Sequence, residues 1–235
     1  MKFNINCDLG EGMSNDSKLM PYIHECNIAC GGHFGDTQSI CSTLKLAIKH
    51  NVLVGAHPSF PDKENFGRKI ISLSADDLSE SLYNQIANFN AMCSLFNVKM
   101  NHIKLHGALY NLTCFDSLLA QLVLDVYLQL NISVKLFAPY KSVLAQLAKG
   151  KFEVIYEAFI DRRYNQDLSL VNRSLKRAII KKPENAYNQV QSIVNTGFIT
   201  SIDGNKVAIK ADTFCLHSDN PQAIQLAQYL YRKCQ

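Results

Sequence analysis

The sequence predicts an α/β protein, a distorted seven-stranded (β/α) barrel, from three observations. Apolar strand-like runs alternate with helix-like periodic segments along the chain, which indicates a mostly parallel sheet. About seven strands can be counted, one fewer than in the standard barrel. Polar residues capable of chemistry follow almost every apolar run within a few positions, and a barrel would gather them at one rim. An open doubly wound sheet is the alternative architecture.

The predicted elements follow one another without a linker or low-complexity tract, so residues 1–235 are expected to form a single domain. Strands are expected at Phe3–Cys7, Cys26–Cys30, Val52–Ala56, His102–His106, Val134–Phe137, Glu153–Phe159 and Thr213–Leu216, with a further short strand at Val207–Ile209 before the last. Helices are expected at Thr37–His50, from the capping box Ser74–Asp77 to Phe96, at Leu118–Leu130, Ser142–Lys149 and Glu184–Asn195, and from Asn220-Pro221 onward. The polar stretch after the sixth strand is expected to be a long loop on the active-site side.

Composition excludes several classes of protein. The net charge is only +4, and the densest basic stretch, Arg173–Lys182, is interpreted as a solvated face or an interface, so no nucleic-acid partner is expected. The eight cysteines form no C-x-x-C pair and indicate a reducing compartment. No apolar run is long enough for a bilayer, and the first residues lack the pattern of a signal peptide. A cytoplasmic protein without a membrane partner is expected; self-association is left open.

Two carboxylates follow the first predicted strand. Asp8 and Glu11 lie three residues apart in the string Asp8-Leu-Gly-Glu-Gly12, whose glycines allow a sharp turn. Either carboxylate could act as a general base or bind a hard cation, and the alternative is that it satisfies loop amides. Both are predicted catalytic residues.

The string Asn27-Ile-Ala-Cys-Gly-Gly-His-Phe-Gly-Asp36 follows the second strand. Its glycines would bring backbone N–H groups close to a ligand, so Asn27, Gly32 and Asp36 are predicted to bind substrate. His33 is a predicted catalytic residue that could pair with Asp36 in acid–base work or bind a metal. Cys30 is interpreted as a buried structural cysteine rather than a nucleophile.

The third and fourth strands end in further candidates. His57 stands before a proline at a strand end, where it would face the rim, and Arg68 could clamp a carboxylate or phosphate. Lys104 and His106 are two residues apart and would share one face of a strand. An inward lysine is costly unless it meets an anion. His57, Lys104 and His106 are predicted catalytic, and Arg68 and Tyr110 substrate-binding.

The last two strand ends complete the set. Asp161 and His217 are predicted catalytic residues, and Arg162 is predicted to bind substrate. Three common templates are missing. The sequence contains no P-loop motif, no G-x-G-x-x-G dinucleotide fingerprint and no G-x-S-x-G nucleophile elbow.

At these residues the chain resembles the 5-oxoprolinase A-subunit family, also called the lactam-utilisation or YcsF-like family. The resemblance extends over essentially the whole chain, with Leu105, Asn172 and Ser218 as departures that remove no ionisable group. The matching strings are Cys7–Gly12, Asn27–Asp36, Gly55–Asp62, Asn65–Arg68, Lys104–Tyr110, Glu157–Tyr164, Leu216–His217 and Asp219.

The resemblance implies a distorted seven-stranded barrel of the glycoside hydrolase/deacetylase type. It implies ATP-dependent opening of 5-oxo-L-proline to L-glutamate, with ATP as co-substrate and two partner subunits, B and C. A metal ion, such as Mg²⁺ with ATP, is left open. On this basis Asp8 or His57 would act as the base that takes a proton from water. Lys104, Arg162 and Arg68 would hold anions. Backbone amides around Gly31–His33 would stabilise an oxyanion. His33, His106 and His217 would be proton shuttles or ligands.

Two other functions stay open at this point. The first is a metal-dependent deacetylase or amidohydrolase on the same barrel, with Asp8, His33 and His57 as the candidate metal ligands. The second is a substrate-binding subunit that is inactive without its partners.

Overall fold

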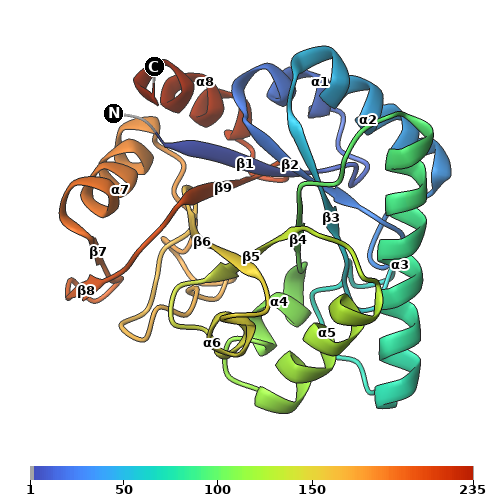
Figure 1. Cartoon of the computed structure of the whole chain (residues 1–235). Coiled ribbons are helices and arrows are strands. Elements are labelled where there is room, and N and C mark those ends of the chain that lie inside the picture. Colours follow the sequence, from blue (N-terminus) through green and yellow to red (C-terminus); the bar gives the residue numbers. More distant parts are fainter. Residues whose placement is uncertain (1–2, 235) are drawn as a thin grey trace.

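Seven parallel strands close into a barrel in the computed structural model, which describes residues 3–234. The strands are β1 (Asn4–Leu9), β2 (Glu25–Ala29), β3 (Leu53–His57), β4 (His102–Lys104), β5 (Lys135–Pro139), β6 (Glu153–Phe159) and β9 (Thr213–His217). The first six pair in chain order, and β9 closes the barrel by pairing with both β1 and β6 (Figure 1). The predicted seven-stranded (β/α) barrel is confirmed, and the open sheet is excluded.

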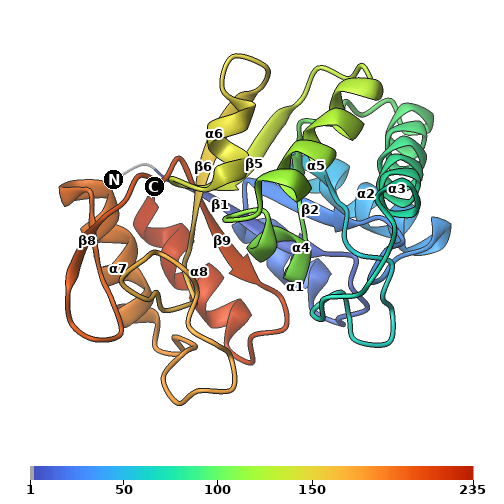
Figure 2. The same ribbon diagram turned by 90° about the horizontal axis from the view of Figure 1, so that it is seen from below.

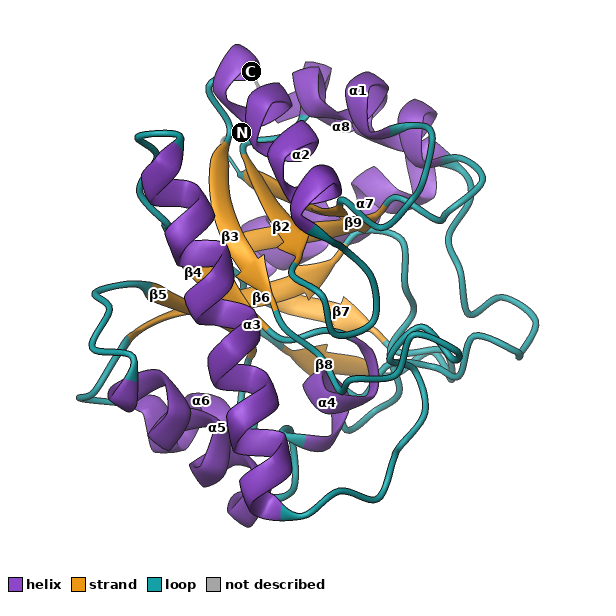
Figure 3. Cartoon of the chain, turned by 90° about the vertical axis from the view of Figure 1, so that its right-hand side faces the viewer, coloured by secondary structure: helices purple, strands orange, loops and turns teal. Residues whose placement is uncertain are grey.

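Helices surround this barrel. They are α1 (Asp16–Leu19), α2 (Thr37–His50), α3 (Ala75–Leu95), α4 (Gly107–Leu112), α5 (Ser117–Gln129), α6 (Val143–Ala148), α7 (Pro183–Thr196) and α8 (Ala223–Cys234), with a short 3₁₀ turn η1 (Met20–Tyr22). Figure 3 shows α2 and α3 over one side of the strands. The apolar stripe of α2 (Ile40, Leu44 and Ala47) is buried there, because residues at this spacing share one helix face. None of the helices in residues 3–234 combines the length and apolar character needed to cross a membrane.

Three segments differ from the predicted elements. The fourth strand ends at Lys104 rather than His106, because Gly107 takes a positive φ of 57° and begins α4. The predicted strand Val207–Ile209 lies outside the barrel, where β8 (Lys206–Ala208) pairs only with β7 (Phe198–Thr200). The last helix begins at Ala223, three residues later than predicted, because Asn220 is held in a preceding turn by its bonds to Asp161 and His217.

The inside of the barrel is polar. Alternate strand residues face inward, and they bind one another across it: Asn27 donates to Asn6, which donates to Thr213, whose hydroxyl donates to Glu25. Gly55 leaves room for the ring of His102, with which any Cβ at that position would collide. This network joins β1, β2 and β9 inside the barrel, on the amino-terminal side of the strand ends that carry the candidate site.

The loop between β6 and α7 and the loop after β3 leave the same side of the barrel, the lower side in Figure 2. The first of these, residues 160–182, is the long loop that the sequence predicts beside the active site. Both loops line one cavity, to which they contribute Arg68, Arg162 and Arg173.

Candidate active site

A cavity of about 480 Å³ opens at the carboxyl ends of the strands. The residues that line it come from six strands, β1, β3, β4, β5, β6 and β9, and from the segments that follow β1, β3, β4, β5, β6 and β8. The structure thus brings together residues that are scattered over most of the sequence, as expected for a barrel of parallel strands. Nine of the fourteen predicted site residues are among them: Asp8, Glu11, His57, Arg68, Lys104, His106, Tyr110, Arg162 and His217.

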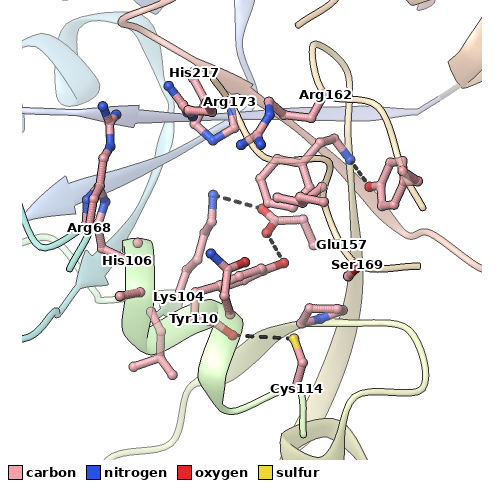
Figure 4. Close-up of a pocket in the computed structure, with 18 of the residues that line it drawn as sticks. Arg68, Lys104, His106, Tyr110, Cys114, Glu157, Arg162, Ser169, Arg173 and His217 are labelled. Carbon is pink, nitrogen blue, oxygen red and sulfur yellow. Dashed lines mark hydrogen bonds and ion pairs between the residues drawn. The ribbon is translucent and has the colours of Figure 1, made fainter. Parts of the chain in front are cut away.

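A buried group of three charges lies at the bottom of the cavity, and we call Asp8, Lys104 and Glu157 the ion triad. The ammonium of Lys104 lies 2.8 Å from Asp8 Oδ1 and 3.1 Å from Glu157 Oε1, and its side chain is 2% exposed. Tyr110 donates to the other oxygen of Glu157 at 2.7 Å (Figure 4). The expected anion beside Lys104 is therefore supplied by the protein itself.

Asp8 and Lys104 keep their charges despite burial. Burial alone would lower the pKa of Lys104, but Asp8, then Cys215 and Glu157, hold it well above the usual range. Asn27 lies beneath the triad and donates to Asp8 Oδ1 at 2.8 Å. Asn27 does not line the cavity, so the structure gives this predicted substrate-binding residue a supporting position behind Asp8.

Beside the triad lie Glu11, His33, His57 and His106, which we call the histidine cluster. One ligand atom from each of the four lies within 4.8 Å of the others. Glu11 Oε1 is 2.9 Å from His33 Nε2 and 3.3 Å from His106 Nδ1, and His106 Nδ1 is 2.9 Å from His57 Nε2. All four residues are buried, and the rings of His33 and His106 stack in parallel with centroids 3.6 Å apart.

Burial favours the neutral imidazole at two histidines of this cluster, His33 and His106. It is the main cause that lowers the pKa of His33 to about 3 and also lowers the pKa of His106. His33 lies behind Glu11 and does not line the cavity. His57 links the cluster to the ion triad, since its Nε2 is 3.5 Å from Asp8 Oδ2 and its Nδ1 binds the carbonyl of Lys104.

Three arginines and His217 also line the cavity (Figure 4). Arg68 and Arg173 share Asp219, with Arg173 Nη1 2.8 Å from its Oδ2. His217 Nδ1 binds Asp161 at 2.8 Å, and Asn220 donates to the other oxygen of Asp161. Asp161 is buried behind His217 and does not line the cavity, so its position suits orienting His217 rather than touching a ligand.

Arg162 differs from the other two arginines. Its side chain is buried and donates to the carbonyl of Val171, yet no carboxylate of residues 3–234 lies within ion-pair distance, and Nε has no partner among them. Burial, then the charge of Arg173, lowers its pKa to about 10, which still leaves the guanidinium charged at neutral pH. Arg162 is therefore a buried cation in the cavity wall that lacks an anion.

Three predicted roles in the string after β2 need correction. Asp36 is exposed and caps α2, where its side chain accepts from the N–H of Ser39. Gly32 is packed so closely against Ser59 and Gln85 that a Cβ would collide with both. The N–H of Gly31 donates to Phe34. Asp36, Gly31 and Gly32 do not line the cavity, so the glycines serve packing and turning there rather than oxyanion binding.

The cysteines behave as the sequence indicates. All eight are free, and burial raises the pKa of Cys30 to about 12. A thiol of this kind is a poor nucleophile at neutral pH, which agrees with a structural role for Cys30.

Sequence reasoning left two charged residues of the cavity wall, Glu157 and Arg173, out of the predicted site. Glu157 stands within β6 rather than after it, and its signal is a carboxylate in the otherwise apolar run Val154–Phe159. Arg173 stands far along the loop that follows β6, and nothing in the pattern of this loop shows that it folds back over the cavity. Asp219, which holds Arg68 and Arg173 together, has no predicted role either.

The arrangement suits hydrolysis of an amide. Asp8 Oδ2 faces the cavity beside His57 and could accept a proton from water. Arg162 could hold an anion. Carboxylate and imidazole groups such as those of the histidine cluster are the donors that bind divalent transition metals. The predicted metal ligands Asp8, His33 and His57 are not the set whose ligand atoms come together; that set is Glu11, His33, His57 and His106.

Comparison with known proteins identifies relatives of this chain over nearly its whole length. The 5-oxoprolinase A subunit of Bacillus cereus (strain AH820) is 38% identical over 236 residues, which cover 97% of this chain and 93% of that protein. The protein of the same name from Bacillus mycoides is also 38% identical over the same shares. The crystal structure of the lactam utilization protein from Thermus thermophilus superposes with a TM-score of 0.89 at 31% identity, covering 99% of this chain and 97% of that one.

A more distant structure shares the fold alone. The chitinase ChiB of Flavobacterium johnsoniae has a TM-score of 0.51 at 10% identity, over 99% of this chain and 94% of its own. The model of the LamB/YcsF family matches residues 3–235. With a match of this extent and relatives at this level of identity, the chain belongs to the LamB/YcsF family.

Proposed function

We propose that this chain is the A component of an ATP-dependent 5-oxoprolinase, which opens the lactam of 5-oxo-L-proline to give L-glutamate while ATP becomes ADP and phosphate. The names of its relatives support the lactam as substrate. The cavity supports an amide substrate that carries a carboxylate. Subunits B and C are the proposed partners.

The observation that carries this proposal is Arg162. A buried guanidinium without a carboxylate partner among residues 3–234 is stabilised by a bound anion, through charge-assisted hydrogen bonds. The α-carboxylate of 5-oxo-L-proline is such an anion. A lactam held by Arg162 in this cavity would lie against the wall that contains Asp8 and His57.

ATP is needed for a chemical reason. Amide resonance and the stability of an unstrained five-membered ring both oppose hydrolysis, and phosphorylation of the amide oxygen removes the resonance. Water then adds to the ring carbon, and the C–N bond breaks as the nitrogen takes a proton. The resulting acyl phosphate reacts with a second water to give glutamate and phosphate. Loss of phosphate before the C–N bond breaks would only regenerate the lactam.

The residues of the cavity suit the hydrolytic half of this sequence. Asp8 is proposed as the base that takes a proton from water, because Lys104 and Asn27 fix its Oδ1 and leave Oδ2 toward the cavity. Lys104 keeps Asp8 ionised, and Arg68 and Arg173 are placed to hold phosphoryl oxygens. His106 and His217 line the cavity and are proposed to move protons at the ring nitrogen.

The test is ATP-dependent glutamate formation from 5-oxo-L-proline. We expect no turnover by the purified chain alone, and stoichiometric release of glutamate and ADP when subunits B and C are added. Glutamate formation by the chain alone would overturn the need for partners. Inactivity of the assembled complex, with every component folded and bound, would overturn the proposed function.

A second candidate function is favoured by the histidine cluster: metal-dependent hydrolysis of an amide without ATP. Three imidazoles and a carboxylate that meet beside a cavity resemble the ligand sets of zinc hydrolases in their donor types. Omission of ATP separates the two functions, since only the second would continue to release product.

A further inference from the structure

The histidine cluster presents an unusual arrangement of ring nitrogens. Each of its three histidines uses one ring nitrogen to bind an oxygen outside the cluster and points the other nitrogen inward. Which inward nitrogens carry hydrogen follows from what the outward partners are able to do.

For two of the histidines the outward partner is a backbone carbonyl, which only accepts hydrogen bonds. His57 Nδ1 lies 2.8 Å from the carbonyl of Lys104, so the hydrogen of the neutral ring is on Nδ1 and Nε2 has a lone pair. His106 Nε2 lies 3.0 Å from the carbonyl of Phe66, which leaves the lone pair on Nδ1. These two inward nitrogens are only 2.9 Å apart.

The third histidine is fixed in the same way through a serine. Ser59 donates its hydroxyl hydrogen to the carbonyl of Phe60 at 2.8 Å. The hydroxyl can therefore only accept from His33 Nδ1, which lies 3.0 Å away. The lone pair of His33 Nε2 then faces Glu11 Oε1, itself an acceptor, at 2.9 Å.

Four acceptors thus converge without a hydrogen between them. Lone pairs this close repel one another unless a cation lies among them. The spacing between Glu11 Oε1 and His106 Nδ1 is 3.3 Å, and ligands about 2.0–2.1 Å from a tetrahedral zinc ion are about 3.3 Å apart. The outward bonds of the three imidazoles are those that orient metal-bound histidines.

We propose that Glu11, His33, His57 and His106 bind one divalent metal ion of the zinc class. Glu11, His57 and His106 line the cavity, so the ion would lie at its wall, with Asp8 Oδ2 next to it, 3.5 Å from His57 Nε2. The proposal goes beyond the 5-oxoprolinase function, because metal binding by the chain does not depend on which reaction follows. An ion at this position would polarise a carbonyl oxygen or activate a water.

The other group of close ligand atoms, from Asp8, Cys215 and His217, is unsuited to a metal. The ammonium of Lys104 donates to Asp8 Oδ1 and Cys215 Sγ, at 2.8 and 2.9 Å. Its positive charge already occupies the position that a cation would need. Because Lys104 already supplies the cation in this group, His217 is a suitable control residue for experiments on metal binding.

The experiment uses the full chain, stripped with a chelator and titrated with Zn²⁺ and Co²⁺. We expect one ion bound per chain by elemental analysis, the visible spectrum of Co²⁺ with nitrogen and oxygen ligands in tetrahedral geometry, and a higher midpoint of thermal unfolding with Zn²⁺. Failure of the folded wild-type chain to bind either ion would overturn the proposal, and would show instead that protons hold the cluster together.

Variants locate the ion. We expect the double variant His33→Gln/His106→Gln to lose binding, and Glu11→Gln, which keeps the shape of the side chain, to bind at least about tenfold more weakly. His217→Gln should bind as the wild type does. Circular dichroism checks that each variant is folded. Wild-type affinity in a folded Glu11→Gln protein, or loss of binding in a folded His217→Gln protein, would contradict the site. The outcome is independent of the 5-oxoprolinase assay, which can fail while metal binding succeeds.

Discussion

The ion triad and the histidine cluster lie side by side at the bottom of one cavity, yet their polar groups are arranged in opposite ways. In the triad, the ammonium of Lys104 lies between two carboxylates, and Asn27 and Tyr110 donate to them. In the cluster, the ring N–H groups point outward and the acceptors point inward. The triad contains its own cation, whereas the cluster is complete only when a cation is added.

The difference is instructive because both regions are buried and polar. Burial by itself does not identify a binding site. What distinguishes the cluster is the direction of its donors, and what distinguishes Arg162 is a charge that no carboxylate of residues 3–234 balances. At both places a ligand would satisfy groups that the protein leaves unsatisfied.

The largest expected effect on stability comes from removing the cation of the triad. Lys104→Met leaves the carboxylates of Asp8 and Glu157 buried without a counter-charge, which we expect to lower the free energy of unfolding by roughly 3–5 kcal/mol. Urea-induced unfolding measures the loss. Adding Glu157→Gln should restore part of it, because one of the two buried charges is then removed. A loss below about 1 kcal/mol would mean that the triad does not depend on Lys104.

Asp16 gives a second test, next to the cluster. Burial, assisted by the charge of Glu11, raises the pKa of Asp16 to about 6, while an unfolded aspartate titrates near about 3.9. The folded state therefore binds this proton more tightly than the unfolded state. The stabilisation is present in full below pH ~4 and is lost as the pH rises through about 6.

Asp16→Asn should remove this dependence. Relative to the wild type, the variant is expected to gain up to roughly 3 kcal/mol of unfolding free energy between pH 4 and pH 7, and its amide oxygen can still accept from the N–H of Gly10, as the carboxylate does. Unfolding measured at both pH values tests this. An equal difference between the two proteins at pH 4 and pH 7 would show that Asp16 has an ordinary pKa.

The smallest effect is expected outside both regions. Asp36→Ala removes the cap of α2 and should lower the midpoint of thermal unfolding slightly. Because Asp36 is exposed and does not line the cavity, glutamate formation by the assembled complex should stay at the wild-type rate. A severe loss of activity in the folded variant would return Asp36 to the active site.

The sequence predicts the barrel and most of the charged and histidine side chains of the cavity wall, because both follow from local patterns. Alternation of strands and helices indicates the parallel sheet, and the residues that end each strand must then meet at one rim. Lys104 and His106 are predicted to face the same way, and both line the cavity although the strand ends between them.

The remaining features depend on contacts that no local pattern contains. Asp36 looks like a partner of His33 in sequence, but the first turn of α2 uses its carboxylate. Gly31 uses its N–H within its own turn. Arg173 reaches the cavity only because a long loop folds back, and the outward hydrogen bonds that fix the ring nitrogens of the histidine cluster come from segments far apart in the chain.

We infer that both regions act on one substrate in one active site. The most direct measurement is the rate of ATP-dependent glutamate formation by the complex of this chain with subunits B and C, with His57→Gln or Lys104→Gln in this chain and with Asp36→Ala as the control. We predict losses of about 100-fold or more for the first two variants and a wild-type rate for the third. Wild-type rates with folded His57→Gln and Lys104→Gln would contradict the account.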